Sequence, residues 1–374
     1  MGPGTSRNGS GITRGVRGLA WVAAVGVAGW GVLWSGCGPS YGPAPGAVGS
    51  AGAVGADGSG AAAPADLVLS EEAWTFDSSP GRVIRTVSYA VHTTMEGGLI
   101  VDRAPAFLER ALVHYTTTLG VLPRPPRTME TYLLSTRPQW NRLTRTLLGA
   151  EAEPFLRIER GGFSHRGRGV YYDIGPKDTL TIAAHEGWHQ YVQTTFRDAL
   201  PVWLDEGVAT YMEGFRWDPK EPDRPVFLPW SNLERYETLR WTAARGRLMP
   251  LGELLRSSPQ SLMEQDPRSP LRYYAQVWGL IHFLREGEGG KYSPALSKLL
   301  LDASQGRVGE TVREAMGGPA ARAFATRRDG TVVFSAYFTP DLDRLDQEFR
   351  AFIDEISSRG HRQKVSQGKS PILD

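Results

Sequence analysis

The chain has 374 residues, a length sufficient for one large domain or two modest ones. Its 42 Lys and Arg against 40 Asp and Glu give a net charge of only +2, and the two signs are interspersed without a basic stripe, which argues against a nucleic-acid-binding protein. A single cysteine excludes an internal disulfide framework and a cysteine-based zinc site, so the fold must depend on its hydrophobic core.

The N-terminal residues have the pattern of a bacterial secretory signal of the lipoprotein type. An arginine-containing segment precedes the apolar residues 19–34, and Cys37 follows directly after small residues. We expect residues 1–37 to be a signal peptide and Cys37 to carry a lipid that anchors the protein in the cell envelope, outside the cytoplasm. An uncleaved signal anchor and a plain secreted protein are the alternatives, although a transmembrane helix needs about 20 apolar residues.

Residues 38–66 form the next compositional unit, made mostly of Gly, Ala, Pro and Ser. Such a segment buries too little apolar surface to offset the conformational entropy of the chain. We therefore predict a flexible, disordered linker between the membrane and the folded part.

Residues 67–177 alternate between strand-like and helix-like patterns. Asp102 is in a suitable position to cap the first helix, and Pro138 suits the first turn of the second. The pattern predicts a small α+β subdomain with a mixed or mostly antiparallel sheet. The expected elements are strands at 82–91, 128–134 and 168–174, and helices at 102–119 and up to residue 148.

The next helix contains an H-E-x-x-H motif, His185-Glu186-Gly187-Trp188-His189. Positions i and i+4 share one helix face, so His185 and His189 can aim one imidazole nitrogen each at a common point. Glu186 lies about 100° further round the helix, where its carboxylate could accept a proton from water that a metal activates. Asp178 is the expected N-cap, and Gly187 indicates close packing by the following helix or by a substrate strand.

A catalytic zinc ion usually has three protein ligands, so a third residue is required. Glu206 is the best candidate, because a turn at 198–201 and a second helix from Val202 return the chain toward the two histidines. Glu213, two turns later, is the alternative third ligand.

The segments H-E-G-W-H-Q at 185–190 and L-P-V-W-L-D-E-G-V-A-T-Y-M-E at 200–213 resemble the gluzincins, the thermolysin-like and aminopeptidase-like zinc peptidases, and most closely the peptidase-MA-like group. The resemblance implies one zinc ion held by His185, His189 and Glu206, with Glu186 as general base. It also implies that an edge strand, here 168–174, pairs with an extended peptide substrate.

A second likeness lies at residues 273–284, Y-Y-A-Q-V-W-G-L-I-H-F-L. In the aminopeptidase-like branch, a tyrosine that opens such a helix stabilises the oxyanion of the reaction. The resemblance gives Tyr274 this role. The alternative is that Tyr273 and Tyr274 are ordinary aromatic residues at the start of a helix.

The C-terminal region, residues 178–360, is expected to be mainly helical and to form the zinc-binding catalytic subdomain. Residues 219–229 are rich in Pro and charge and are expected to form a loop that rims the cleft. Residues 361–374 are expected to be disordered. Further helices are predicted at 250–256, 274–285, 293–303 and 341–356.

Together these patterns predict an α+β protein with a small sheet, a zinc-binding helix under an edge strand, and a mainly helical C-terminal part. The expected function is that of a lipid-anchored zinc metallopeptidase acting on peptides or proteins. An endopeptidase is favoured, because the sequence has no acidic motif for binding a substrate N-terminus. The alternatives are a non-catalytic envelope scaffold or binding protein, and a zinc hydrolase of a non-peptide amide or ester. The sequence contains no signal for the oligomeric state.

Overall fold

The computed structural model describes residues 67–373, apart from 159, 265, 267 and 328. The predicted signal peptide with Cys37 and the predicted linker at 38–66 lie outside the described residues. Within the described part of the chain, no helix combines the length and apolar character needed to cross a membrane.

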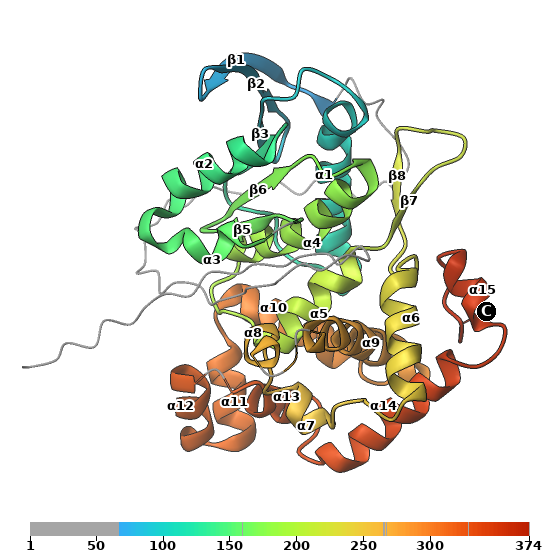
Figure 1. Ribbon diagram of the computed structural model, residues 1–374. Helices are drawn as coiled ribbons and strands as arrows, with labels where there is room; N and C mark the ends of the chain where they lie inside the picture. Colours follow the sequence, from blue (N-terminus) through green and yellow to red (C-terminus); the bar gives the residue numbers. More distant parts are fainter. Residues whose placement is uncertain (1–66, 159, 265, 267, 328, 374) are drawn as a thin grey trace, which may run out of the picture.

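The N-terminal half contains a six-stranded sheet with its helices (Figure 1). The strands are β1 (Ser70–Phe76), β2 (Ser79–Arg85), β3 (Tyr89–Thr93), β4 (Met129–Leu134), β5 (Phe163–His165) and β6 (Arg168–Tyr172). The strand order is β1-β2-β3-β4-β6-β5; β4 is parallel to both β3 and β6, and the other pairs are antiparallel. The sheet is therefore mixed, as the sequence predicted. The helices of this half are α1 (Leu99–Thr117), α2 (Arg137–Leu148), α3 (Glu153–Leu156) and α4 (Pro176–Thr195).

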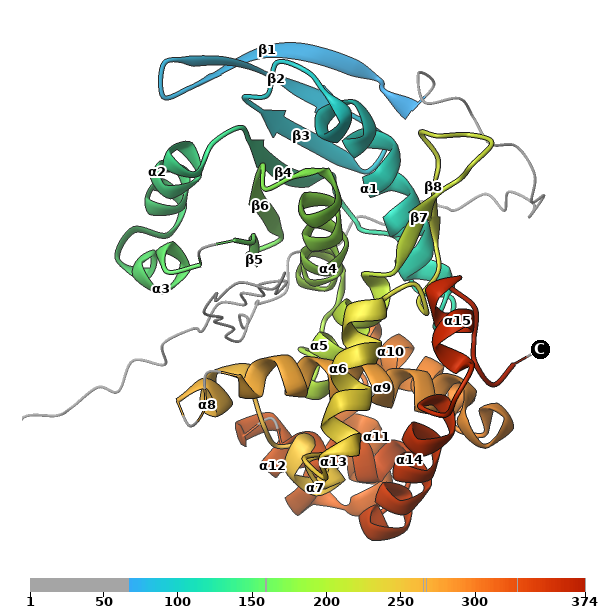
Figure 2. The same ribbon diagram turned by 45° about the vertical axis from the view of Figure 1, so that its right-hand side comes forward.

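The two faces of the sheet are covered by different helices (Figure 2). Successive strand residues point to opposite faces. Tyr171 faces α4, where it lies with Leu180 and Ala183, whereas the ring of Tyr172 contacts Trp140 of α2 at 5.5 Å between centroids. Helix α1 packs beside α4 on the first face. This arrangement places the motif helix between the sheet and the rest of the protein.

The prediction that residues 168–174 form the edge strand of the sheet is wrong. Strand β6, which corresponds to the predicted 168–174, lies between β4 and β5, so the edge of the sheet is β5. The reason is a tight turn at Arg166 and Gly167, both with positive φ (51° and 76°), which folds β5 back onto β6 as a hairpin. The sequence predicted β6 but not this partner.

Other boundaries also differ from the prediction. The expected strand at 82–91 is two strands, β2 and β3, separated by a turn, and β1 was not predicted. Asp102 and Asp178 are not N-caps, because α1 follows Gly98 and α4 follows Gly175. Both glycines have φ above 100° (109° and 102°), a conformation that an aspartate rarely adopts. The aspartates instead lie in the first turns of the two helices.

The C-terminal half is mainly helical, as predicted, and α9 runs through its centre (Figure 2). The amphipathic pattern predicted at 341–356 is confirmed as α14, which buries its apolar face. The region expected to be a loop at 219–229 contributes one strand of a small hairpin, whose Phe215 and Phe227 pack on Phe107 of α1. The elements of this half are α5 (Val202–Met212), β7 (Phe215–Trp217), β8 (Pro225–Phe227), α6 (Leu233–Ala244), α7 (Leu251–Leu254), α8 (Pro259–Met263), α9 (Ser269–Gly290), α10 (Ser293–Gln305), α11 (Val308–Met316), α12 (Gly318–Arg327), α13 (Gly330–Tyr337), α14 (Leu342–Ile356) and α15 (His361–Ser366).

The prediction of a disordered tail after residue 360 is also wrong. Helix α15 forms there, and the side chain of Val365 is 0% exposed. Arg216 donates a hydrogen bond to the carbonyl of Ser366, and the hydroxyl of Ser370 donates to Glu286 at 2.6 Å. The segment is too short to be stable as an isolated helix, so these tertiary contacts hold it in place.

We expect Val365→Asp to lower the free energy of unfolding by about 2 kcal/mol or more, because a fully buried valine contributes about 1.5–3 kcal/mol and an unpaired charge is costly to bury. The matched control is Leu373→Asp, whose side chain is 52% exposed. Urea denaturation of both variants tests this; equal stabilities for Val365→Asp and wild type would mean that the tail does not pack.

Candidate metal centre

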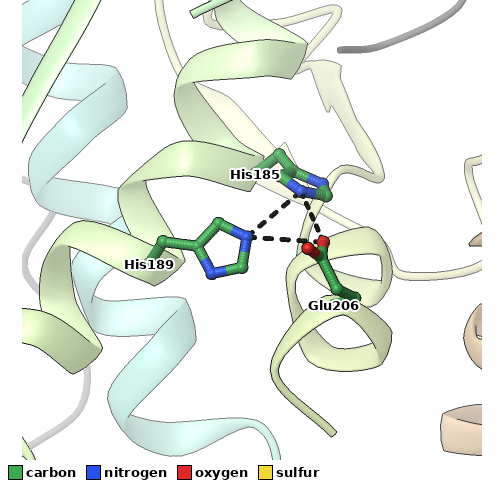
Figure 3. A group of neighbouring side chains, drawn as sticks. All are labelled: His185, His189 and Glu206. Carbon is green, nitrogen blue, oxygen red and sulfur yellow. Dashed lines mark hydrogen bonds and ion pairs between the residues drawn. The ribbon is translucent and has the colours of Figure 1, made fainter. Parts of the chain in front are cut away.

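Three buried side chains from α4 and α5 converge on one point (Figure 3). The Nε2 atoms of His185 and His189 are 3.3 Å apart. Oε2 of Glu206 lies 3.4 Å from Nε2 of His185 and 3.5 Å from Nε2 of His189. The structure thus brings together the three residues that the sequence predicted as metal ligands.

These distances would suit a tetrahedral metal site. With zinc–ligand bonds of about 2.0–2.1 Å, the ligand atoms of a tetrahedron are about 3.3–3.4 Å apart. The three observed separations, 3.3, 3.4 and 3.5 Å, form one nearly equilateral face of such a tetrahedron. The fourth corner has no protein ligand among the described residues. This combination suits a catalytic site, which keeps one position for water or substrate.

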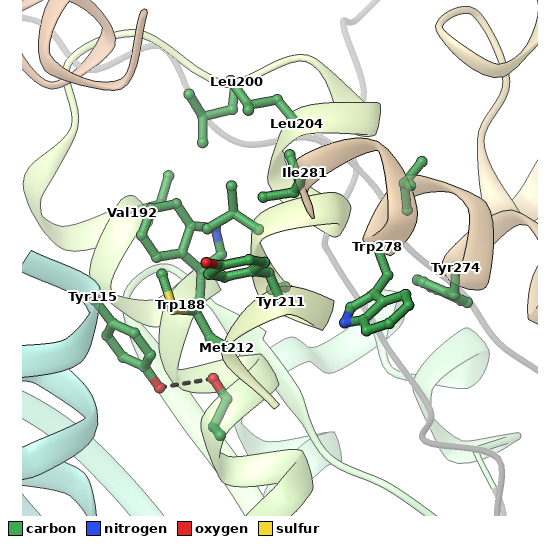
Figure 4. Close-up of a cluster of buried hydrophobic side chains, with 14 of the residues drawn as sticks. Tyr115, Trp188, Val192, Leu200, Leu204, Tyr211, Met212, Tyr274, Trp278 and Ile281 are labelled. Atoms are coloured by element: carbon green, nitrogen blue, oxygen red, sulfur yellow. Dashed lines mark hydrogen bonds between the residues drawn. The ribbon is translucent and has the colours of Figure 1, made fainter. Parts of the chain in front are cut away.

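The helical hairpin that creates this convergence depends on close helix packing (Figure 4). Helix α5 packs against both α4 and α9. Gly207, next to Glu206, allows the approach of α9, because a Cβ at this position would lie 2.9 Å from Cγ1 of Ile281 and 3.2 Å from the carbonyl of Val277. A larger residue there would move Glu206 relative to the histidines.

Gly187 has a different neighbour from the two that the sequence suggested. A Cβ on Gly187 would lie 2.6 Å from the hydroxyl of Tyr115 on α1, so neither α5 nor a substrate strand requires this glycine. The same hydroxyl donates a hydrogen bond to the carbonyl of Ala184 at 2.7 Å (Figure 4). Helix α1 thereby supports the motif helix from behind.

Each histidine has a carboxylate on its outer nitrogen. Nδ1 of His185 lies 2.8 Å from Oε1 of Glu213, and Nδ1 of His189 lies 3.0 Å from Oδ1 of Asp205. A carboxylate accepts the hydrogen bond, so Nδ1 carries the proton and the lone pair of Nε2 points to the common centre. Glu213 is therefore not the third ligand; it lies behind His185 and orients its ring.

The outer carboxylates are themselves held by further buried groups. Arg235 of α6 donates two hydrogen bonds to Glu213, at 3.0 and 3.2 Å, and Asn232 donates a third at 2.6 Å. The indole of Trp188 donates to Asp205 at 2.9 Å. Asp205 and Glu213 belong to the motif at 200–213, but the sequence did not identify Arg235 or Asn232, which carry no motif of their own.

The charge of the site favours a cation. Glu186, Asp205, Glu206 and Glu213 are each at most 4% exposed, and within the described part of the chain the one buried guanidinium beside them is that of Arg235, at 3%. With neutral imidazoles, four negative charges against one positive charge leave three net negative charges in a region of low dielectric. Such an excess is costly unless protons or a metal ion compensate it.

The pKa values of these groups show how the metal-free protein compensates. Burial lowers the pKa of His185, but hydrogen bonds with Glu206 and Glu213 outweigh this and raise it above its usual 6.5. The pKa of His189 is raised further, since Asp205 and Glu206 outweigh burial. Burial raises the pKa of Glu206, but the two histidines bring it to about 2. Imidazolium protons therefore occupy the same electrostatic position that a dication would take.

The backbone of Glu186 contacts the edge strand β5. Its backbone carbonyl accepts a hydrogen bond from Ser164 of β5 at 2.6 Å. Gln193, seven residues later and so nearly on the same side of the helix, donates to the carbonyl of Ser164 at 3.3 Å. The helical spacing therefore puts Glu186 on the side of α4 that faces β5, and it follows His185 directly in the chain.

Two consecutive tyrosines on α9 approach the site from the C-terminal half. The ring of Tyr274 is 6.1 Å from that of His185 in an edge-on arrangement. Tyr274 was a candidate from the sequence, although it lies in the second turn of α9 and does not open the helix. Burial, followed by the charges of Glu206 and Asp205, raises the pKa of Tyr273. The sequence did not single out Tyr273 as a functional residue.

A cavity of about 700 Å³ lies beside the outer carboxylate Glu213. Its walls come from the first turns of α1, α4 and α6, from β7 and from α15. His185, His189 and Glu206 are not among its lining residues. Among its charged lining residues are Arg103, Lys177 and Glu234.

We expect Glu213→Gln to weaken zinc binding by about 10–100-fold, because a carboxylate behind a ligating histidine raises the basicity of that ligand and fixes its ring. Glu221→Gln, in the exposed β7–β8 connection, is the control. Competitive titration with a zinc chelator measures both; unchanged affinity in Glu213→Gln would contradict the assigned role.

Zinc affinity should rise as the pH increases from about 6 to above the ordinary pKa of histidine. The reason is that the pKa values of His185 and His189 are raised, so zinc must displace protons from them. The folding stability of the protein without metal should change in the opposite direction and fall as the pH rises. Its imidazolium–carboxylate contacts stabilise the fold below the unfolded histidine pKa and are lost as the pH rises through the raised folded values. Zinc titrations and thermal unfolding across this range test both trends; a pH-independent affinity would contradict them.

Comparisons with known proteins do not assign the chain. No family model matches it, and neither a curated protein nor a solved structure matches it. The resemblance to gluzincins therefore depends on the motif residues at 185–213.

Proposed function

We propose that this protein is a zinc-dependent metallopeptidase of the gluzincin type. The observation that carries the proposal is the convergence of His185, His189 and Glu206 with separations of 3.3–3.5 Å between their ligand atoms. Two imidazoles and one carboxylate are ligands that zinc accepts, and the outer carboxylates give both imidazoles the required tautomer. The net negative charge of the site adds electrostatic support.

A zinc ion bound by these residues would supply a Lewis acid that polarises a carbonyl group and lowers the pKa of water. Glu186 acts as the general base: it takes a proton from the attacking water while the new C–O bond forms. It then passes that proton to the departing nitrogen as the C–N bond breaks. The position of Glu186 on the side of α4 that faces β5 supports this role.

Strand β5 supports a peptide as the substrate. It is the terminal strand of the sheet beside α4, so an extended peptide can add to it through backbone hydrogen bonds. Gln193 also accepts a hydrogen bond from the backbone N–H of Gly167 at 2.9 Å, and Gln190 donates to the carbonyl of Gly167 at 3.1 Å. These hydrogen bonds fix the β5–β6 hairpin to the motif helix α4. A peptide bound along β5 would therefore lie at a fixed distance from α4.

Tyr274 is the proposed donor to the oxyanion. Its ring lies edge-on to His185, and the guanidinium of Arg235 is 5.3 Å from the ring centre. A phenol hydroxyl near the metal can stabilise the negative charge that develops on the substrate oxygen. The resemblance at 273–284 supports the same residue.

The remaining elements of the proposal concern location and specificity. The lipoprotein-type signal and Cys37 support a lipid-anchored enzyme of the cell envelope, with the membrane as its second partner. An endopeptidase is favoured over an aminopeptidase. A zinc hydrolase of another amide or ester would use the same ligands and base, but only a peptide can pair with β5 along its backbone. A non-catalytic scaffold would not require Glu186 in addition to the three ligands.

We expect Glu186→Gln to retain zinc and to lose peptide hydrolysis by about 10²–10⁴-fold, the usual contribution of a general base. Metal content by mass spectrometry and turnover of a mixed peptide library measure the two properties, with Glu153→Gln, an exposed change on α3, as the control. Wild-type turnover in Glu186→Gln would contradict the mechanism. Zinc binding with cleavage of esters only would favour the non-peptide alternative.

A further inference from the structure

The hydroxyl of Tyr273 is a buried polar group without a hydrogen-bond partner. The side chain is 0% exposed, and no described atom lies within hydrogen-bonding distance of its oxygen in a suitable geometry. A buried donor left unsatisfied costs about 1–3 kcal/mol. Such a group in a well-packed core requires a reason.

The position of Tyr273 on α9 provides that reason. Residues 273, 277 and 281 are spaced four apart and so share one face of the helix. Val277 and Ile281 on this face contact α5 at Gly207, the residue that follows Glu206. Tyr273 is therefore on the face that packs on α5, one turn before this contact. The carboxylates of Glu206 and Asp205 are the charged groups that act on its hydroxyl.

The two adjacent tyrosines serve different sides of the centre. Consecutive helical residues differ in direction by about 100°. Tyr274 turns its ring to His185 and Arg235, whereas Tyr273 lies on the side of Glu206 and Asp205. Their ring centres are 6.0 Å apart. The oxyanion role proposed for Tyr274 therefore leaves the hydroxyl of Tyr273 unexplained.

We propose that Tyr273 is a positioning residue for the metal ligand Glu206, whose carboxylate accepts a hydrogen bond from the Tyr273 hydroxyl when the metal is bound. In the metal-free protein Glu206 is paired with the two histidines. A metal ion held by the two imidazoles and this carboxylate would take the place of those contacts. A ligating carboxylate is normally hydrogen bonded by a neighbouring group, and the phenol of Tyr273, on the face of α9 that packs on α5, is a buried donor without a partner. The inference depends on the proposed zinc site but not on peptide hydrolysis.

The test is Tyr273→Phe, which removes only the hydroxyl. We expect zinc to bind this variant about 10–100-fold more weakly than wild type, the usual effect of losing a group that orients a ligand. The midpoint of thermal unfolding of the metal-free variant should equal or exceed that of wild type, because the change removes an unsatisfied donor. If Tyr273 had a purely structural role, its substitution would not lower zinc affinity while leaving the thermal stability of the metal-free protein unchanged or higher.

Tyr89→Phe is the matched control. The hydroxyl of Tyr89 is also fully buried without a partner, but Tyr89 is on β3 and its charged neighbour is Glu109. This variant should leave zinc affinity unchanged. Tyr274→Phe should also retain zinc affinity while hydrolysis falls.

Wild-type zinc affinity in Tyr273→Phe, or an equal loss of affinity in Tyr89→Phe, would overturn the inference. The proposed function fails by a different result, namely a wild-type protein that binds zinc and cleaves no peptide. Because zinc affinity is measured without a substrate, the two failures are distinguishable.

Discussion

The structure depends on the contact between α4 and α5, which holds two imidazoles and a carboxylate within 3.3–3.5 Å of one another in a buried environment. This contact brings four buried carboxylates together, and among the described residues Arg235 is the one buried guanidinium beside them, so the pairing of Glu206 with the two imidazoles is part of what makes the contact stable. Helix α1 supports α4 through Tyr115, and α9 supports α5 at Gly207. Packing of apolar surfaces around the centre and the paired charged groups within it therefore maintain the arrangement together.

The outer layer of the site explains how such a centre can be ready for a metal. Arg235, Asn232 and Trp188 hold the two outer carboxylates, and these hold the two imidazole rings. The outer hydrogen bonds reduce the rotational freedom of the carboxylates, and the carboxylates reduce that of the imidazole rings. Less side-chain entropy is therefore lost when a metal binds. In the metal-free protein, protons on the imidazoles compensate part of the negative charge. A zinc ion would replace these protons.

The two halves of the molecule contribute different parts of the proposed chemistry. The sheet half supplies the motif helix and the β5–β6 hairpin, which Gln190 and Gln193 fasten to that helix. The helical half supplies Glu206, the outer carboxylates, and the tyrosines of α9. A peptide bound along β5 would thus meet the metal ligands, the base and the hydroxyl donors from both sides.

The sequence by itself determined what local geometry controls. His185 and His189 share a face because they are four residues apart, Glu206 returns on a hairpin of nearly fixed length, and α14 is amphipathic by its own periodicity. Only the tertiary structure decided which strand is the edge, that Glu213 lies behind His185, that Arg235 joins the site, and that α15 is ordered. These features arise from contacts between residues far apart in the chain, and the free energy of such contacts leaves no periodic pattern in the sequence.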